Sequence, residues 1–135
     1  MLMISNLSKI AIAVTALTIV FSTHAEEITF ENTVSKATDT LVVFHGTDQE
    51  NKTYQTYNQQ SNGQLDKAIS ASDFKGDFGK FIEVLAPHNL AYQRVVIVGT
   101  GDKALTKDKL TRLGANLSAK LEQKPIKHIT VAADH

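Results

Sequence analysis

The pattern with the clearest chemical potential is a glycine turn, Gly99-Thr100-Gly101, which directly follows a run of β-branched residues. Backbone amides between a strand and a helix can hold an anion, because the first amides of a helix have no intrahelical partner. Gly99, Thr100 and Gly101 are therefore the candidate residues for binding a phosphate ligand. A dinucleotide fingerprint would require a third glycine where this chain has Ala104, and the helix begins only after Leu105. The spacing favours a plain connection from strand to helix.

No side-chain pattern predicts a catalytic set or a metal centre. The chain has no cysteine, which excludes a thiol nucleophile, a disulfide scaffold and cysteine-based zinc or iron–sulfur sites. Asp73 and Asp77 lie four residues apart, but nearby glycines indicate a turn with solvated acids. The histidines after residue 25 have no partner at ligand spacing; they are His45, His88, His128 and His135. We therefore expect no catalytic residue, no metal ligand and no cofactor in this chain.

Basic residues gather on the last predicted helix and on its flanks. They are Lys103, Lys107, Lys109, Arg112, Lys120, Lys124 and Lys127. The pattern favours a solvated helix face, since the interleaved aromatic residues on which bases stack are missing. The whole chain has 14 basic and 14 acidic side chains, so no global charge attracts nucleic acid or anionic lipid. We do not expect a nucleic-acid partner.

Five segments have the hydrophobic patterns of β-strands. Residues 27–34 alternate between apolar and polar side chains, which is typical of a strand with one solvent-exposed face. Residues 40–44 and 94–98 are continuous apolar runs rich in β-branched residues, as in central strands. The other two predicted strands are residues 81–86 and 127–132.

A long helix is predicted between the last two strands. Thr106 is placed to cap its first turn and Pro125 to end it. Its apolar stripe recurs at steps of three and four residues and consists of Leu110, Leu113, Leu117 and Leu121. A strand, a helix and a strand in this order imply a parallel pair joined by a right-handed crossover.

Two further segments complete the prediction. Residues 65–69 have the spacing of a short helix, whereas the polar residues 48–62 fit a surface loop or a frayed helix. The pattern as a whole predicts one α/β domain with a mixed sheet flanked by helices.

The first 25 residues have the composition of a targeting segment. Lys9 precedes an apolar run at residues 10–21, and small residues then lead to Ala25. This order is typical of a secretory signal peptide, and the run is shorter than the about 20 residues that span a bilayer. We therefore expect cleavage after Ala25 and an exported, periplasmic or secreted, domain of residues 26–135 with no membrane span.

Two motifs occur in order along the chain. The first is Asp73-Phe-Lys-Gly-Asp-Phe-Gly-Lys80, and the second is Arg94-Val-Val-Ile-Val-Gly-Thr-Gly101, followed by the leucine-spaced helix. Together they resemble the N-terminal domain of leucyl aminopeptidases, the M17 or cytosol aminopeptidase family, over most of residues 28–133. The resemblance implies an α/β domain similar to macro domains, packed beside a separate catalytic domain.

The resemblance also implies where the family's chemistry lies. In the family, two divalent metals and the catalytic lysine and arginine belong to the C-terminal domain, around an N-T-D-A-E-G-R segment that this chain lacks. We therefore expect a domain truncated at its C-terminal end and inactive alone. The implied partners are an M17-type catalytic domain or further copies in a homo-oligomer, such as the family's hexamer.

Three functions follow from these observations. In the first, which the resemblance favours, the chain is the non-catalytic domain of an M17-like aminopeptidase and supports the oligomer and shapes access to active sites. Alternatively, it is a small-ligand module of macro-like fold that holds a nucleotide or ADP-ribose phosphate at residues 99–101, or an interaction domain without a ligand. Fold alone does not choose among them.

Overall fold

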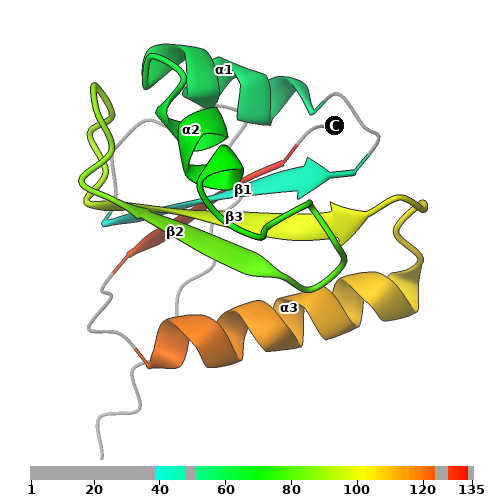
Figure 1. The fold of residues 1–135 in the computed structure, drawn as a ribbon. Coiled ribbons are helices and arrows are strands. Elements are labelled where there is room, and N and C mark those ends of the chain that lie inside the picture. The colour runs from blue at the N-terminus through cyan, green and yellow to red at the C-terminus, as the bar shows by residue number, and fades with distance from the viewer. Residues whose placement is uncertain (1–38, 48–50, 124–127, 134–135) are drawn as a thin grey trace, which may run out of the picture. The chain divides into compact units, whose positions relative to one another are not determined.

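A computed structural model describes residues 39–47, 51–123 and 128–133 (Figure 1). The predicted signal peptide (1–25), the predicted strand at 27–34, and Pro125 lie outside these residues. The elements in chain order are β1 (Thr40–Gly46), α1 (Lys52–Gln60), α2 (Gln64–Ser70), β2 (Phe81–Leu85), β3 (Arg94–Gly101), α3 (Lys107–Glu122) and β4 (Ile129–Ala132). No helix among the described residues is long and apolar enough to cross a membrane.

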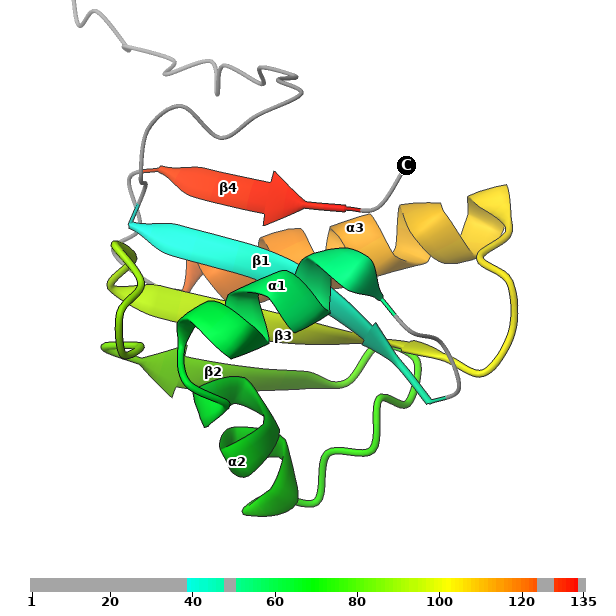
Figure 2. The ribbon, with the colours of Figure 1, turned by 90° about the horizontal axis from the view of Figure 1, so that it is seen from above.

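The strands form one mixed sheet in the order β2-β3-β1-β4. β1 runs parallel to β3 and to β4, and β2 runs antiparallel to β3. α1 and α2 cover one face of the sheet, and α3 covers the other (Figures 1 and 2). This arrangement confirms the predicted α/β class with a mixed sheet flanked by helices.

The predicted pairing of the last two strands is wrong, because β1 lies between β3 and β4. Val42 of β1 is in register with Val96 of β3 on one side and with Val131 of β4 on the other. Residues 40–43 of β1 are buried on both faces by this central position. The hydrophobic pattern shows that a strand is central but does not show which strands flank it.

Successive side chains of β1 and β3 point to opposite faces of the sheet, and this divides the core into two layers. Residues facing α1 and α2 form one buried cluster, built from Leu41, Val43, Tyr54, Leu65, Phe74, Val84, Tyr92, Val95 and Ile97. The cluster under α3 contains Val42, Val96, Val98, Leu113, Leu117 and Leu121. Each full burial of such an aliphatic side chain stabilises the fold by about 1.5–3 kcal/mol.

Two helices differ from the prediction. Part of the segment 48–62 is the regular helix α1, whose first turn is capped by the Asn51 side chain accepting from the Tyr54 amide at 2.8 Å. The buried face of α1 is narrow, since only Tyr54 and Asn58 are buried. In α3, Thr106 caps the helix as predicted, whereas Leu110 is 52% exposed and does not belong to the buried stripe.

Candidate functional site at the carboxyl ends of the central strands

The predicted glycine turn is not a turn in the structure. Residues 99–101 continue β3, and Gly101 lies opposite Gly46 of β1, next to a register shift at His45. Beyond these residues β1 leads to α1 on one face, and β3 leads to α3 on the other (Figure 2). Neighbouring strands whose connections leave on opposite faces form the crevice where open α/β sheets bind ligands. The candidate residues 99–101 therefore lie in the part of the sheet where a ligand would be expected.

The crevice is filled by the chain itself, through residues 73–80. The Gly101 amide donates to the Gly76 carbonyl at 2.8 Å, and the Gly99 amide donates to the Lys80 carbonyl at 2.8 Å. In return the Gly79 amide donates to the Gly99 carbonyl at 3.0 Å. Two of the amides that were predicted to hold a phosphate thus bind internal carbonyls.

Glycines at this contact permit a backbone-to-backbone approach. A Cβ atom on Gly99 would overlap the carbonyl oxygen of Asp77, and a Cβ on Gly76 would lie 3.0 Å from the Gly46 carbonyl carbon. Gly76 and Gly101 also have positive φ angles of 81° and 76°, which other residues rarely adopt. The contact gives no support to the predicted phosphate site at Gly99, Thr100 and Gly101.

Phe78 attaches the 73–80 segment to α3. The Lys109 Nζ and the Arg112 Cζ lie 5.6 Å and 5.9 Å from the centre of the Phe78 ring. Such cation–π contacts contribute about 0.5–1 kcal/mol at exposed sites. Two members of the predicted basic surface therefore have a structural role.

A second cluster, which the sequence did not reveal, joins α1 to α2. The Tyr54 hydroxyl donates to Asp66 Oδ1 at 2.7 Å, and Asn58 Nδ2 donates to Asp66 Oδ2 at 2.6 Å. The Asp66 amide donates to Asn58 Oδ1 at 3.1 Å. Burial, together with the neighbouring Asp66 carboxylate, raises the pKa of Tyr54. Asp66 therefore holds two side chains of α1 at once.

His45, at the end of β1, packs on this cluster. Its ring centre lies 4.6 Å from that of Tyr54 and 6.2 Å from that of Phe74. Burial lowers the pKa of His45, and the attraction of Asp66 opposes this effect without overcoming it. The positions are scattered along the sequence, and only the i, i+4 pair Tyr54 and Asn58 could have indicated a buried face.

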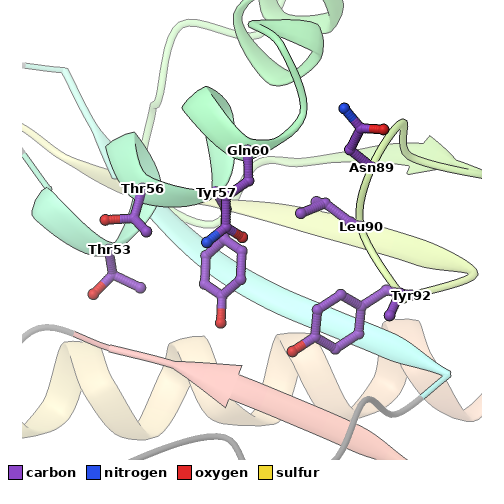
Figure 3. A pocket seen from close by; sticks show the side chains of 8 residues that line it. Thr53, Thr56, Tyr57, Gln60, Asn89, Leu90 and Tyr92 are labelled. Carbon is purple, nitrogen blue, oxygen red and sulfur yellow. The ribbon is translucent and has the colours of Figure 1, made fainter.

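An open groove of about 500 Å³ lies between α1 and the β2–β3 connection (Figure 3). Tyr57 and Tyr92 meet there edge to face, with ring centres 6.2 Å apart. Burial, and secondly a hydrogen bond with Tyr57, raises the pKa of Tyr92 to about 12. The groove residues are uncharged at neutral pH, so the groove offers no acid–base pair.

The other residues selected from the sequence are not brought together into a site. His88 and His128 are exposed, and His135 lies outside the described residues. Asp73 and Asp77 are exposed beside a small cavity of about 310 Å³. Across the described part of the chain, no three His, Asp or Glu side chains are grouped as metal ligands. The metals that the family resemblance implies therefore do not fit these residues.

Taken together, the fold and the filled crevice define an α/β domain with a mixed sheet and without a recognisable catalytic centre in the described residues. The model of the N-terminal domain of the cytosol aminopeptidase family matches residues 40–135. The chain belongs to this family.

Individual relatives agree with the family match. The chain is 37% identical over 103 residues to the probable cytosol aminopeptidase 1 of Shewanella oneidensis, covering 76% of this chain and 21% of that protein. It is 37% identical over 73 residues to the probable cytosol aminopeptidase of a Chelativorans species, covering 53% of this chain and 14% of that protein. A mutant of tomato leucine aminopeptidase has a similar fold, with a TM-score of 0.56 and 21% identity over 72% of this chain and 20% of that chain.

Two consequences follow from these relatives. The chain spans about a fifth of the length of the Shewanella protein, 21%. The prediction of an exported, periplasmic or secreted protein is wrong, because the matched relatives are named cytosol aminopeptidases. A signal-like composition depends on a short apolar run, and such a run does not by itself establish export.

Proposed function

We propose that this chain is the non-catalytic N-terminal domain of an M17 aminopeptidase, where it supports oligomer assembly and shapes access to the active sites. The observation that carries the proposal is the family match over residues 40–135. The filled crevice also supports the proposal. A domain whose crevice at the strand ends is closed by its own backbone is better suited to a structural role than to holding a small ligand.

An exposed apolar surface supports a partner of this kind. β4 is an edge strand of the described sheet, and its Ile129 and Val131 are 42% and 55% exposed. The register with Thr40 and Val42 puts both side chains on the α3 face of the sheet. Leu110 of α3 is also exposed. Exposed apolar side chains on an edge strand, such as Ile129 and Val131, are typical of surfaces that pack against other protein.

The chemistry of the proposed enzyme belongs to its catalytic domain. Two-metal peptide hydrolysis needs clustered ligands with open coordination positions, and the described residues provide no such group. We therefore assign the two divalent metals to the catalytic domain and no reaction step to this chain.

Co-expression tests this proposal. The full chain would be expressed with the part of the Shewanella relative that lies beyond the matched region. Size-exclusion chromatography with light scattering would measure the complex, and leucine-p-nitroanilide its activity. We expect the two polypeptides to elute together with a larger mass than either alone, and hydrolysis to increase when this chain is present.

Matched substitutions make the test specific to the surface. Val131→Glu puts a charge on the exposed apolar surface and should weaken co-elution. Gln59→Glu puts the same charge on an exposed position of α1 and should leave co-elution unchanged. The proposal fails if the catalytic part assembles and hydrolyses substrate equally well without this chain.

A further inference from the structure

We propose that Asn62 is a site of spontaneous chemical modification. The backbone nitrogen of Gly63 displaces the side-chain amide of Asn62, and water then converts the resulting ring to aspartate or isoaspartate. The site is built from the turn between α1 and α2, and it does not depend on the proposed function.

Asn62 and Gly63 form the turn that follows α1 and leads into α2. Both residues have left-handed backbone conformations, with φ angles of 54° and 75°. Asparagine and glycine adopt this conformation more readily than other residues. No other asparagine of the chain is followed by glycine. The shape of the turn therefore favours a pair of residues that can also react with each other.

The reacting groups are accessible in the folded chain. Asn62 is exposed to solvent, and no atom lies within 4 Å of the position that a Cβ atom on Gly63 would occupy. Because glycine has no side chain, its backbone nitrogen can approach Cγ of the preceding asparagine without steric hindrance. A larger residue at position 63 would cover this approach.

The proposed reaction is a cyclisation followed by hydrolysis. The Gly63 nitrogen gives its proton to water and forms a bond with Cγ of Asn62, while Nδ2 takes up a proton and leaves as ammonia. The product is a cyclic imide, in which the Gly63 nitrogen is bonded to Cγ and to the backbone carbonyl carbon of residue 62. Water that breaks the bond to Cγ gives aspartate, and water that breaks the bond to the backbone carbon gives isoaspartate.

One hydrogen bond of the fold opposes the first step. The Gly63 amide donates to the Asn58 carbonyl at 2.8 Å, and the nitrogen must give up this bond before it attacks Cγ. The neighbouring Asn62 amide donates to the Gln59 carbonyl at 3.0 Å and holds the same turn. Local opening of such a turn has a free-energy cost that the unfolded chain does not have. We therefore expect the folded chain to react more slowly than the unfolded chain.

The two products differ in their effect on the turn. Aspartate adds a negative charge between the C-terminal end of α1 and the N-terminal end of α2, where the two helix dipoles act on it in opposite directions. Isoaspartate adds a backbone atom between the Asn62 and Gly63 amides, which are bound to two successive carbonyls of α1. The chain with isoaspartate should therefore melt at a lower temperature than the unmodified chain.

Mass spectrometry of the full chain tests the site, with samples digested at successive times of incubation at neutral pH. Asn89 is an internal control, because it is also exposed and has a φ angle of 55°, but it is followed by Leu90. We expect Asn62 to lose its amide, with both aspartate and isoaspartate as products, while Asn89 stays unmodified. In water labelled with a heavy oxygen isotope, the new carboxylate should carry the label. The same incubation in urea should be several-fold faster.

Two variants assign the reaction. Asn62→Gln keeps a neutral amide but would have to form a larger ring, and it should abolish the modification. Asn89→Gln makes the same change at the control position and should leave the modification of Asn62 unchanged. Because the reaction is also followed in urea, the comparison does not depend on either variant folding.

The proposal is overturned if Asn62 keeps its amide in urea or if Asn89 is modified equally fast. It is also overturned if aspartate is the only product, because direct hydrolysis of the side chain gives no isoaspartate. Equal rates in the folded chain and in urea would contradict the role of the hydrogen bond between Gly63 and Asn58. An unchanged melting temperature of the chain with isoaspartate would contradict its effect on the turn.

Discussion

Gly99 and Asp77 lie in direct backbone contact, so close that a Cβ atom on residue 99 would overlap the Asp77 carbonyl oxygen. The contact places the 73–80 segment across the carboxyl ends of β1 and β3, where the Gly76 carbonyl binds the Gly101 amide at 2.8 Å. A site that open α/β sheets use for ligands is here part of the domain's own packing.

Replacing Gly99 by alanine should destabilise the domain. The new methyl group has no space, so the 73–80 segment must shift, and overpacking of this kind costs about 1–3 kcal/mol or more. Gly114→Ala is the control, because nothing lies near its Cβ position in α3. There the alanine should stabilise the helix by about 0.5–1 kcal/mol. Urea unfolding followed by circular dichroism would measure both, and equal stabilities of Gly99→Ala and the parent would contradict the tight contact.

Phosphate ligands should not stabilise the fold. A ligand at about 100 times its dissociation constant would add roughly 2.7 kcal/mol to the native state, which is a shift of several degrees in a domain of this size. Since internal carbonyls occupy the Gly99 and Gly101 amides, we expect millimolar ADP-ribose, ATP or NAD to leave the melting temperature unchanged. A saturable increase that disappears in Gly101→Val would instead support the small-ligand module, provided that the shift is compared within each variant.

Asp66→Asn should weaken the connection between α1 and α2. The amide has one oxygen for the two donors, Tyr54 and Asn58, so at least one buried donor loses its acceptor. An unpaired buried group costs about 1–3 kcal/mol. Asp102→Asn, at an exposed position after β3, removes the same charge and should change stability little. Thermal unfolding would compare the two, and equal melting temperatures would show that the Asp66 contacts contribute nothing.

The chain alone should not hydrolyse leucine-p-nitroanilide, with or without added manganese or zinc. Two-metal hydrolysis requires clustered ligands, and the described residues bring no such group together. The assay would use the full chain, purified to constant specific activity. Turnover that follows the chain through purification and depends on metal would contradict the assignment of catalysis to another domain.

Much of the architecture was determined by local sequence. The runs at 40–44 and 94–98 predicted the two central strands, and the leucines from Leu113 to Leu121 with the cap at Thr106 predicted α3. These elements bury a regular pattern of side chains, and such a pattern is visible without knowledge of what covers it. The ordered motifs at 73–80 and 94–101 identified the family, which the match over residues 40–135 confirms.

The tertiary structure alone decided how these elements meet. α1 has too few buried side chains to produce a strong periodic pattern, and it is held mainly through Tyr54 and Asn58. The insertion of β1 between β3 and β4 depends on long-range pairing, which no local run of residues encodes. The role of Gly99 was also hidden, because a glycine that binds a phosphate and a glycine that admits a neighbouring backbone have the same sequence signature. Which of the two it is depends on what lies against the missing side chain, and here that is the backbone of Asp77.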